Sequence, residues 1–197
     1  MGYAKTTLLM FIGLVISLDV SAQAELALSD IQLPPGFSIE IWSDEVPNAR
    51  SLALGENGTV FVATRRDGRV YALIPHADAS PSVITLAENL IMPNGVAFQG
   101  GDLYVAENHR ITRYPDIEAS LPQVPEAEVV IDTLPTERYH GWRYIDFGPD
   151  GKLYIAIGAP CNICDKEGFA NISRMNADGT EQEIVAAGIR NSLGFTW

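Results

Sequence analysis

Two side chains that could carry acid–base and electrostatic chemistry stand at corresponding places in this sequence. His140 lies seven residues before Phe147, and Arg190 lies seven residues before Trp197. A neutral imidazole can take a proton near neutral pH, and general-base help is worth roughly 10²–10⁴ in rate. A guanidinium is always charged and binds carboxylates or a developing oxyanion. On spacing alone, a turn histidine and a salt-bridged surface arginine are an equally good interpretation.

The element that must position His140 is a β-hairpin. Residues 144–147 and 153–157 are rich in β-branched and aromatic side chains, and residues 148–151, Gly-Pro-Asp-Gly, favour a turn between them. A hairpin returns the chain to the side from which it came. We therefore expect His140, before the first strand, to share one side of the sheet with Gly158–Cys161, after the second.

The hairpin pattern repeats along the chain. It recurs at 51–63 and 95–106, and residues 194–197 open a further copy. The last residues before the four turns follow one another at steps of 44, 49 and 50, and they are Leu54, Phe98, Phe147 and Trp197. Periods of roughly 20–50 residues indicate solenoids, propellers or arrays, and all-β repeats of this length favour a β-propeller with four-stranded blades.

The rest of each repeat is expected to supply outer strands and connecting loops. Residues 82–85 and 128–131 are candidates for outer strands, and the alternating residues 38–42 also predict a strand in the outer part of a blade. By the hairpin argument, Arg65–Asp67 and Asn108–Arg110 follow the second strand of their own repeats. We expect them on the same side as His140.

A propeller places its innermost strands around a central channel, so His140 and Arg190 would project toward one pocket from adjacent blades. Propellers close a ring of about four to eight blades. This sequence holds three repeats and the start of a fourth, which ends at Trp197. We therefore expect an all-β chain that is the N-terminal piece of a longer protein.

The first 24 residues predict a secretory signal peptide. Lys5 supplies the positive start, Leu8–Leu18 is a short apolar core, and small residues allow cleavage after Ala22 or Ala24. The apolar core is short for a membrane span, which needs about 20 residues, although an uncleaved anchor is the alternative. The prediction is a secreted or periplasmic protein whose mature part, 25–197, is a partial propeller with no membrane span.

Charge and cysteine content narrow the function classes. The formal net charge is −12, which disfavours nucleic acids and anionic membranes as partners, although solubility alone also explains it. Cys161 and Cys164 form the only CxxC pair, with no histidine after it for haem attachment and no second pair for zinc. In an exported protein we expect a local disulfide rather than a redox motif. No dinucleotide fingerprint is present.

At His140–Gly158 and Gly188–Gly194 the chain resembles the soluble quinoprotein sugar dehydrogenases, which include soluble glucose dehydrogenase, aldose sugar dehydrogenase and the sorbosone dehydrogenase-like group. The Gly158–Cys164 run most resembles the sorbosone type. The resemblance implies a six-bladed β-propeller that binds pyrroloquinoline quinone (PQQ) and calcium and oxidises sugars. It also implies that His140 is the general base and that Arg190 and Asn191 contact the quinone.

Two departures accompany the resemblance. Ala159 stands where soluble glucose dehydrogenase has an aspartate that orients the catalytic histidine, so His140 must be oriented by another group. The calcium ligands and further basic quinone contacts of the family lie mostly beyond Trp197. No metal ligand is therefore assigned, and we expect this chain alone to bind the quinone poorly and to turn over little.

Two other functions remain open. A calcium-dependent lactonase would share the architecture, and Asn94, Glu107 and Asn108 are its nearest candidate ligands. A propeller that binds a partner without catalysis is the third interpretation, because a fold alone does not determine function. The electron acceptor and the particular sugar are not specified by these motifs.

Overall fold

The computed structural model describes residues 28–77 and 79–197 of the chain, which divides into two compact units, Met1–Glu40 and Ile41–Trp197. In the first unit the described residues contain one short element, the 3₁₀ helix η1, Leu28–Asp30. The predicted signal peptide, residues 1–24, lies outside the described residues. Among the described residues, no helix is both long enough and apolar enough to cross a membrane.

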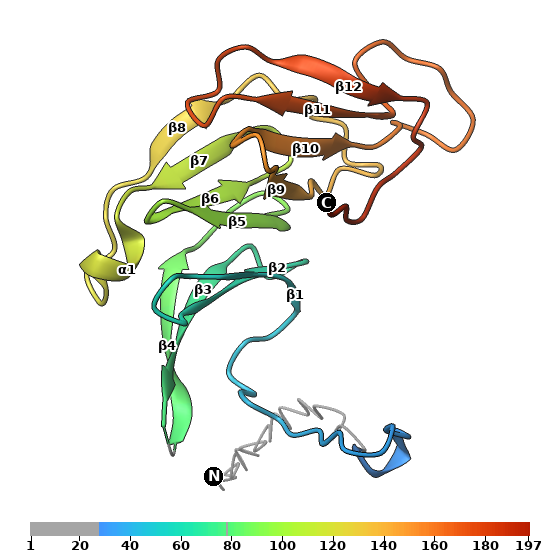
Figure 1. The fold of residues 1–197 in the computed structure, drawn as a ribbon. Helices are drawn as coiled ribbons and strands as arrows, with labels where there is room; N and C mark the ends of the chain where they lie inside the picture. The colour runs from blue at the N-terminus through green and yellow to red at the C-terminus, as the bar shows by residue number, and fades with distance from the viewer. Residues whose placement is uncertain (1–27, 78) are drawn as a thin grey trace, which may run out of the picture. The chain divides into compact units, whose positions relative to one another are not determined.

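The second unit contains three four-stranded antiparallel sheets, and Figure 1 shows them one above another. In each sheet the strands follow chain order, as in a propeller blade. Blade 1 is β1 (Ala49–Leu54), β2 (Val60–Thr64), β3 (Val70–His76) and β4 (Ala79–Ala87); blade 2 is β5 (Gly95–Gln99), β6 (Asp102–Ala106), β7 (Ile111–Tyr114) and β8 (Glu128–Ile131); blade 3 is β9 (Ile145–Phe147), β10 (Leu153–Ile157), β11 (Asn171–Met175) and β12 (Glu183–Ala187).

The three predicted hairpins are confirmed, and each joins the first two strands of a blade. Leu54 pairs with Val60 in the first hairpin, and Phe147 pairs with Leu153 in the third. In the third turn the amide of Gly151 donates to Gly148 O at 2.9 Å, and Gly151 has a φ of 74°, which favours glycine. The turn formers in the sequence therefore identified these hairpins correctly.

Side-chain alternation along the strands builds one core between each pair of blades. On β2, Phe61 and Ala63 pack into the core between blades 1 and 2, while Val62 packs on the opposite side of blade 1. On β6, Leu103 and Val105 join that first core, and the alternate residues of the strand join the core between blades 2 and 3. The first strand of blade 2, β5, lies against both β1 and β9, so the three inner strands are neighbours.

Two sequence expectations are corrected. Residues 38–42 form no strand, because they find no ladder partner among the described residues; Ile39, Ile41 and Trp42 are exposed. Residues 194–197 also form no strand, although Trp197 packs against Tyr154 of β10 with ring centroids 5.0 Å apart. The connection between β7 and β8 contains the short helix α1, Ile117–Ser120.

One end of the three blades carries all the predicted site residues, and we call it the loop face. It consists of the loops that follow the second strand of each blade, at 65–69, 107–110 and 158–170. It also includes the segments that lead back from an outer strand, at 88–94, 132–144 and 188–191. The loop 158–170 of blade 3 is the longest of the first group, and residues 132–144 form what we call the His140 segment.

Candidate functional site

The His140 segment is held by polar side chains of blade 2. The side-chain amide of Asn94 donates to Arg143 O at 2.8 Å. The amide of Asn108 donates to Glu137 O at 3.0 Å and to Gly141 O at 3.1 Å. Asn94 and Asn108 are both buried, so these bonds are shielded from water and fix the backbone on either side of His140.

Arg143 holds the same segment from within. Its side chain is only 1% exposed, and it donates to Asn108 O at 3.0 Å and to Pro135 O at 2.6 Å. Burial lowers the pKa of Arg143 to about 10, partly offset by the charge of Glu137, so the group remains charged at neutral pH. Arg143 is thus a structural cation that joins blade 2 to the start of blade 3.

His140 sits in the left-handed backbone region, with a φ of 50°, which is uncommon outside glycine and is found most often where the surroundings impose it. Its Nδ1 lies 2.8 Å from Ala159 O. A carbonyl oxygen can only accept, so Nδ1 carries the hydrogen in the neutral ring and Nε2 is left as the proton acceptor. The half-buried ring also packs against Tyr139, with centroids 4.2 Å apart.

The backbone carbonyl of Ala159 therefore orients the imidazole of His140. Gly158 is the reason that the histidine can come so close. A Cβ on Gly158 would lie 2.6 Å from His140 Cβ and 2.8 Å from Asn191 Oδ1. Only a glycine lets His140 and Asn191 meet at this peptide.

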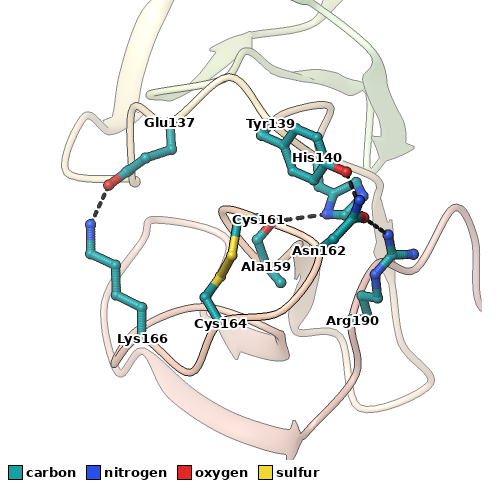
Figure 2. The surroundings of a disulfide bond; sticks show 9 residues. All are labelled: Glu137, Tyr139, His140, Ala159, Cys161, Asn162, Cys164, Lys166 and Arg190. Carbon is teal, nitrogen blue, oxygen red and sulfur yellow. Dashed lines mark hydrogen bonds and ion pairs between the residues drawn. A yellow bond between two sulfur atoms is a disulfide. The ribbon is translucent and has the colours of Figure 1, made fainter.

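Arg190 reaches the same peptide from the other side. Ala159 N donates to Arg190 O at 2.7 Å. Asn162 Oδ1 accepts hydrogen bonds from the guanidinium of Arg190 and, at 2.6 Å, from the hydroxyl of Tyr139, as Figure 2 shows. Arg190, Asn162 and Ala159 line an open cavity of about 640 Å³, and His140 lies outside its lining. The three predicted site residues are thus brought together around residues 158–159.

The loop that carries Asn162 is closed at two points. The expected disulfide joins Cys161 to Cys164, and the ammonium of Lys166 binds the carboxylate of Glu137 in the His140 segment. The hydrogen bond from Lys166 lowers the pKa of Glu137 below its ordinary value. Loop 158–170 and the His140 segment therefore hold each other by a salt bridge as well as by Asn162.

Ion pairing on the chain divides its basic residues into two groups. The first group has a carboxylate within ion-pair distance, and the second group has none among the described residues, although the chain has 25 acidic against 13 basic residues. The members of the second group are Arg50, Arg65, Arg66, Arg138, Arg143 and Arg190. All six lie on the loop face or at the strand end that opens onto it. Apart from Arg143, which is buried, these arginines give the loop face exposed positive charge, which suits an anionic ligand.

The residues considered for a calcium-dependent lactonase have structural partners here. Glu107 is buried, accepts the amide of Ile91 at 2.6 Å and forms an ion pair with Arg110. Asn94 and Asn108 use their amide groups on the His140 segment. Within residues 28–77 and 79–197, no three His, Cys, Asp or Glu side chains gather as a metal site.

Sequence reasoning missed three residues that build this site. Arg143, Tyr139 and Asn162 act on His140 or Arg190 through contacts between segments that are far apart in the chain. An arginine inside a strand-forming pattern was a signal for Arg143, because the neighbouring positions are apolar. Nothing in the spacing of Tyr139 and Asn162 indicates that they meet.

Comparison with known proteins adds information on the fold. No model of a known protein family matches this chain. An uncharacterized protein of Borreliella burgdorferi is 24% identical over 189 residues, which are 90% of this chain and 48% of that protein. The chain therefore spans about half the length of the curated relative that it matches.

Several solved structures share the architecture. The holo PQQ domain of pyranose dehydrogenase from Coprinopsis cinerea has a TM-score of 0.65 at 16% identity, over 76% of this chain and 41% of that one. PQQ-bound aldose sugar dehydrogenase from Streptomyces coelicolor has a TM-score of 0.53 at 20% identity, over 74% of this chain and 52% of that one. A streptogramin B lyase has a TM-score of 0.52 at 14% identity, over 77% of this chain and 45% of that one. These likenesses show the fold, a partial β-propeller, which both dehydrogenases and a lyase use.

Proposed function

We propose that this chain is part of an exported, six-bladed quinoprotein that oxidises aldose sugars or related sugar aldehydes with PQQ. One observation carries the proposal: His140, Asn191 and Arg190 meet around the backbone of residues 158 and 159. A proton acceptor then lies beside a cavity whose lining includes a cationic group for an acidic cofactor. The presence of PQQ-bound sugar dehydrogenases among structures with this fold supports the choice.

In this proposal the residues of the chain orient and deprotonate the sugar. Bound PQQ supplies a hydride acceptor, which no side chain can provide. His140 receives the hydroxyl proton at Nε2, because its Nδ1–H donates to Ala159 O. Arg190 binds an acidic group of the cofactor, and Asn191 beside it offers an amide. Close placement of base and cofactor supplies much of the rate increase.

The residues present fit the quinone better than they fit calcium. PQQ is acidic, and Arg190, which lines the 640 Å³ cavity together with Asp165, forms no ion pair among the described residues. Within the described residues, no three His, Cys, Asp or Glu side chains lie together as a site for calcium. We therefore keep calcium as part of the proposal for the whole protein and assign it no residue and no step here.

The test is sugar-dependent reduction of an artificial electron acceptor by the product of the complete reading frame, supplied with PQQ and Ca²⁺. We expect His140→Ala to lower kcat by roughly 10²–10⁴ with the cofactor still bound. The matched control is His76→Ala, since His76 bonds Ser82 at the opposite end of blade 1. Unchanged turnover in His140→Ala, or equal activity without quinone, would refute the proposal.

A further inference from the structure

A second cavity on the loop face lies between blades 1 and 2, away from Arg190. It has a volume of about 390 Å³ and is lined by Arg65, Arg66, Leu90, Ile91, Met92, Arg138 and Trp142. We call it the arginine cavity. Its volume falls in the range of about 300–1,000 Å³ that is usual for small-molecule sites.

Its charge is the first reason to assign it a ligand. Arg65, Arg66 and Arg138 come from two segments far apart in the chain and line the same cavity. None of the three has a carboxylate partner among the described residues, in a chain with a net charge of −12. Like charges around one cavity repel each other, and an anion between them relieves that repulsion.

Its walls are fixed to one another, which is the second reason. Trp142 Nε1 donates to Arg65 O at 3.1 Å, and the guanidinium of Arg65 lies over the indole ring, 4.8 Å from its centroid. Leu90 N donates to Gly68 O at 2.9 Å and so joins the third wall to the loop that carries Arg65. The indole and one arginine are therefore held before any ligand arrives.

The wall formed by residues 90–92 is fixed by a buried charge. Glu107, 1% exposed, accepts the amide of Ile91 at 2.6 Å, and Ile91 O accepts the amide of Asn108 at 2.9 Å. Met92 is in the left-handed region, with a φ of 55°, a conformation that needs support from its surroundings. The apolar wall is thus held in an unfavourable conformation by blade 2.

We propose that the arginine cavity binds the carboxylate of an acidic saccharide, a uronic acid unit, and so selects the substrate class. This rests on the proposed sugar oxidation. Guanidinium groups match a carboxylate in charge and geometry. The apolar wall with Trp142 suits the C–H face of a pyranose ring, through many weak dispersion contacts. Because the cavity is small, a nucleic acid would also contact the chain around it, and the net negative charge of the chain would repel the phosphates.

The test is titration calorimetry of the chain with D-glucuronate, without quinone or electron acceptor. We expect saturable binding, at least about tenfold tighter than for D-glucose, because one hydrogen bond to a charged group changes the dissociation constant by about tenfold or more. Acetate, which has the carboxylate without the ring, should also bind more weakly. Added salt should weaken glucuronate binding, since exposed charges are screened.

Variants locate the binding. Arg66→Ala and Arg138→Ala should each weaken glucuronate binding about tenfold without loss of fold, because neither side chain has an ion-pair partner among the described residues. Arg113→Ala is the matched control, since Arg113 pairs with Asp102 and Glu128 on blade 2. Absent glucuronate binding, equal binding of glucose or acetate, or affinities unchanged in both cavity variants would each overturn the proposal.

The outcome is separable from that of the proposed function. Calorimetry contains no redox step, so glucuronate binding that depends on Arg66 and Arg138 stands even if the complete protein oxidises no sugar. Conversely, quinone-dependent oxidation of neutral sugars by a protein that ignores glucuronate would retain the dehydrogenase proposal and remove this one.

Discussion

His140 owes its position to neighbours rather than to its own preference. A φ of 50° is rare for a residue with a Cβ, and the carbonyl of Ala159 fixes the ring through a hydrogen bond to Nδ1. The hydrogen bond to a carbonyl also selects the tautomer. The proton-accepting nitrogen therefore follows from one backbone contact, without an aspartate.

At Gly158 we predict that a single methyl group disturbs the site. In Gly158→Ala the new Cβ would lie 2.6 Å from His140 Cβ, so the backbone must move, and we expect a loss of about 1–3 kcal/mol in the free energy of unfolding. Urea denaturation measures it. Gly194→Ala is the control, because its Cβ would meet its nearest atom, in Tyr144, only at 3.9 Å. Equal stability of the two variants would contradict this account of the site.

The salt bridge between Glu137 and Lys166 predicts a pH dependence. The hydrogen bond from Lys166 holds the pKa of Glu137 below its ordinary value, so the salt bridge is present at neutral pH and is lost as pH falls through the lowered pKa. NMR titration of the Glu137 carboxyl should show this, and Lys166→Ala should return the pKa to its ordinary range. A titration that Lys166→Ala leaves unchanged would show that the salt bridge is not formed in solution.

Among the elements, the His140 segment depends on Arg143 more than on regular structure. The segment has no strand or helix between Asp132 and Tyr144, yet Arg143 and two asparagines hold it at both ends of its course over blade 2. A loop held by buried hydrogen bonds can position a functional side chain as firmly as a strand does.

We predict that Arg143→Ala lowers the free energy of unfolding by about 2–4 kcal/mol. The change leaves the carbonyls of Asn108 and Pro135 without their donor and removes a fully buried side chain. Removal of the buried charge stabilises the folded state and so opposes this loss. The two unpaired carbonyls and the lost packing cost more free energy than that removal returns. Chemical denaturation gives the value. Arg174→Ala, which removes two partly exposed ion pairs, should cost under about 1 kcal/mol. A similar effect at both sites would argue against the role of Arg143.

At the scale of the whole molecule, the described core belongs to one unit. All twelve strands and every residue of the three core clusters lie within Ile41–Trp197. We predict that residues 41–197 fold by themselves, with a thermal midpoint within about 4 °C of the full chain, which corresponds to roughly 1 kcal/mol. Circular dichroism on heating tests this. Loss of the cooperative transition in residues 41–197 would show that the first 40 residues are needed for the fold.

The strands could be read from the sequence because hairpins are local. Turn residues such as those at 148–151 and alternating apolar residues act over a few positions, so the four-stranded repeat and the blade order followed from them. Residues 38–42 show the limit of this reasoning. They alternate well, yet without a partner strand among the described residues an alternating segment forms no sheet.

The repeat in the sequence placed His140 and Arg190 at one end of the blades, since each copy keeps the same register, and the family resemblance added Asn191 beside Arg190. Only the tertiary structure decided what holds them. Ala159 O, Asn162 and Arg143 act across loops whose meeting depends on how the blades pack, and no local pattern encodes that packing. The same reason explains the arginine cavity: Arg66 and Arg138 are 72 residues apart in the chain, and only the packing of blades 1 and 2 with the His140 segment brings them to one cavity.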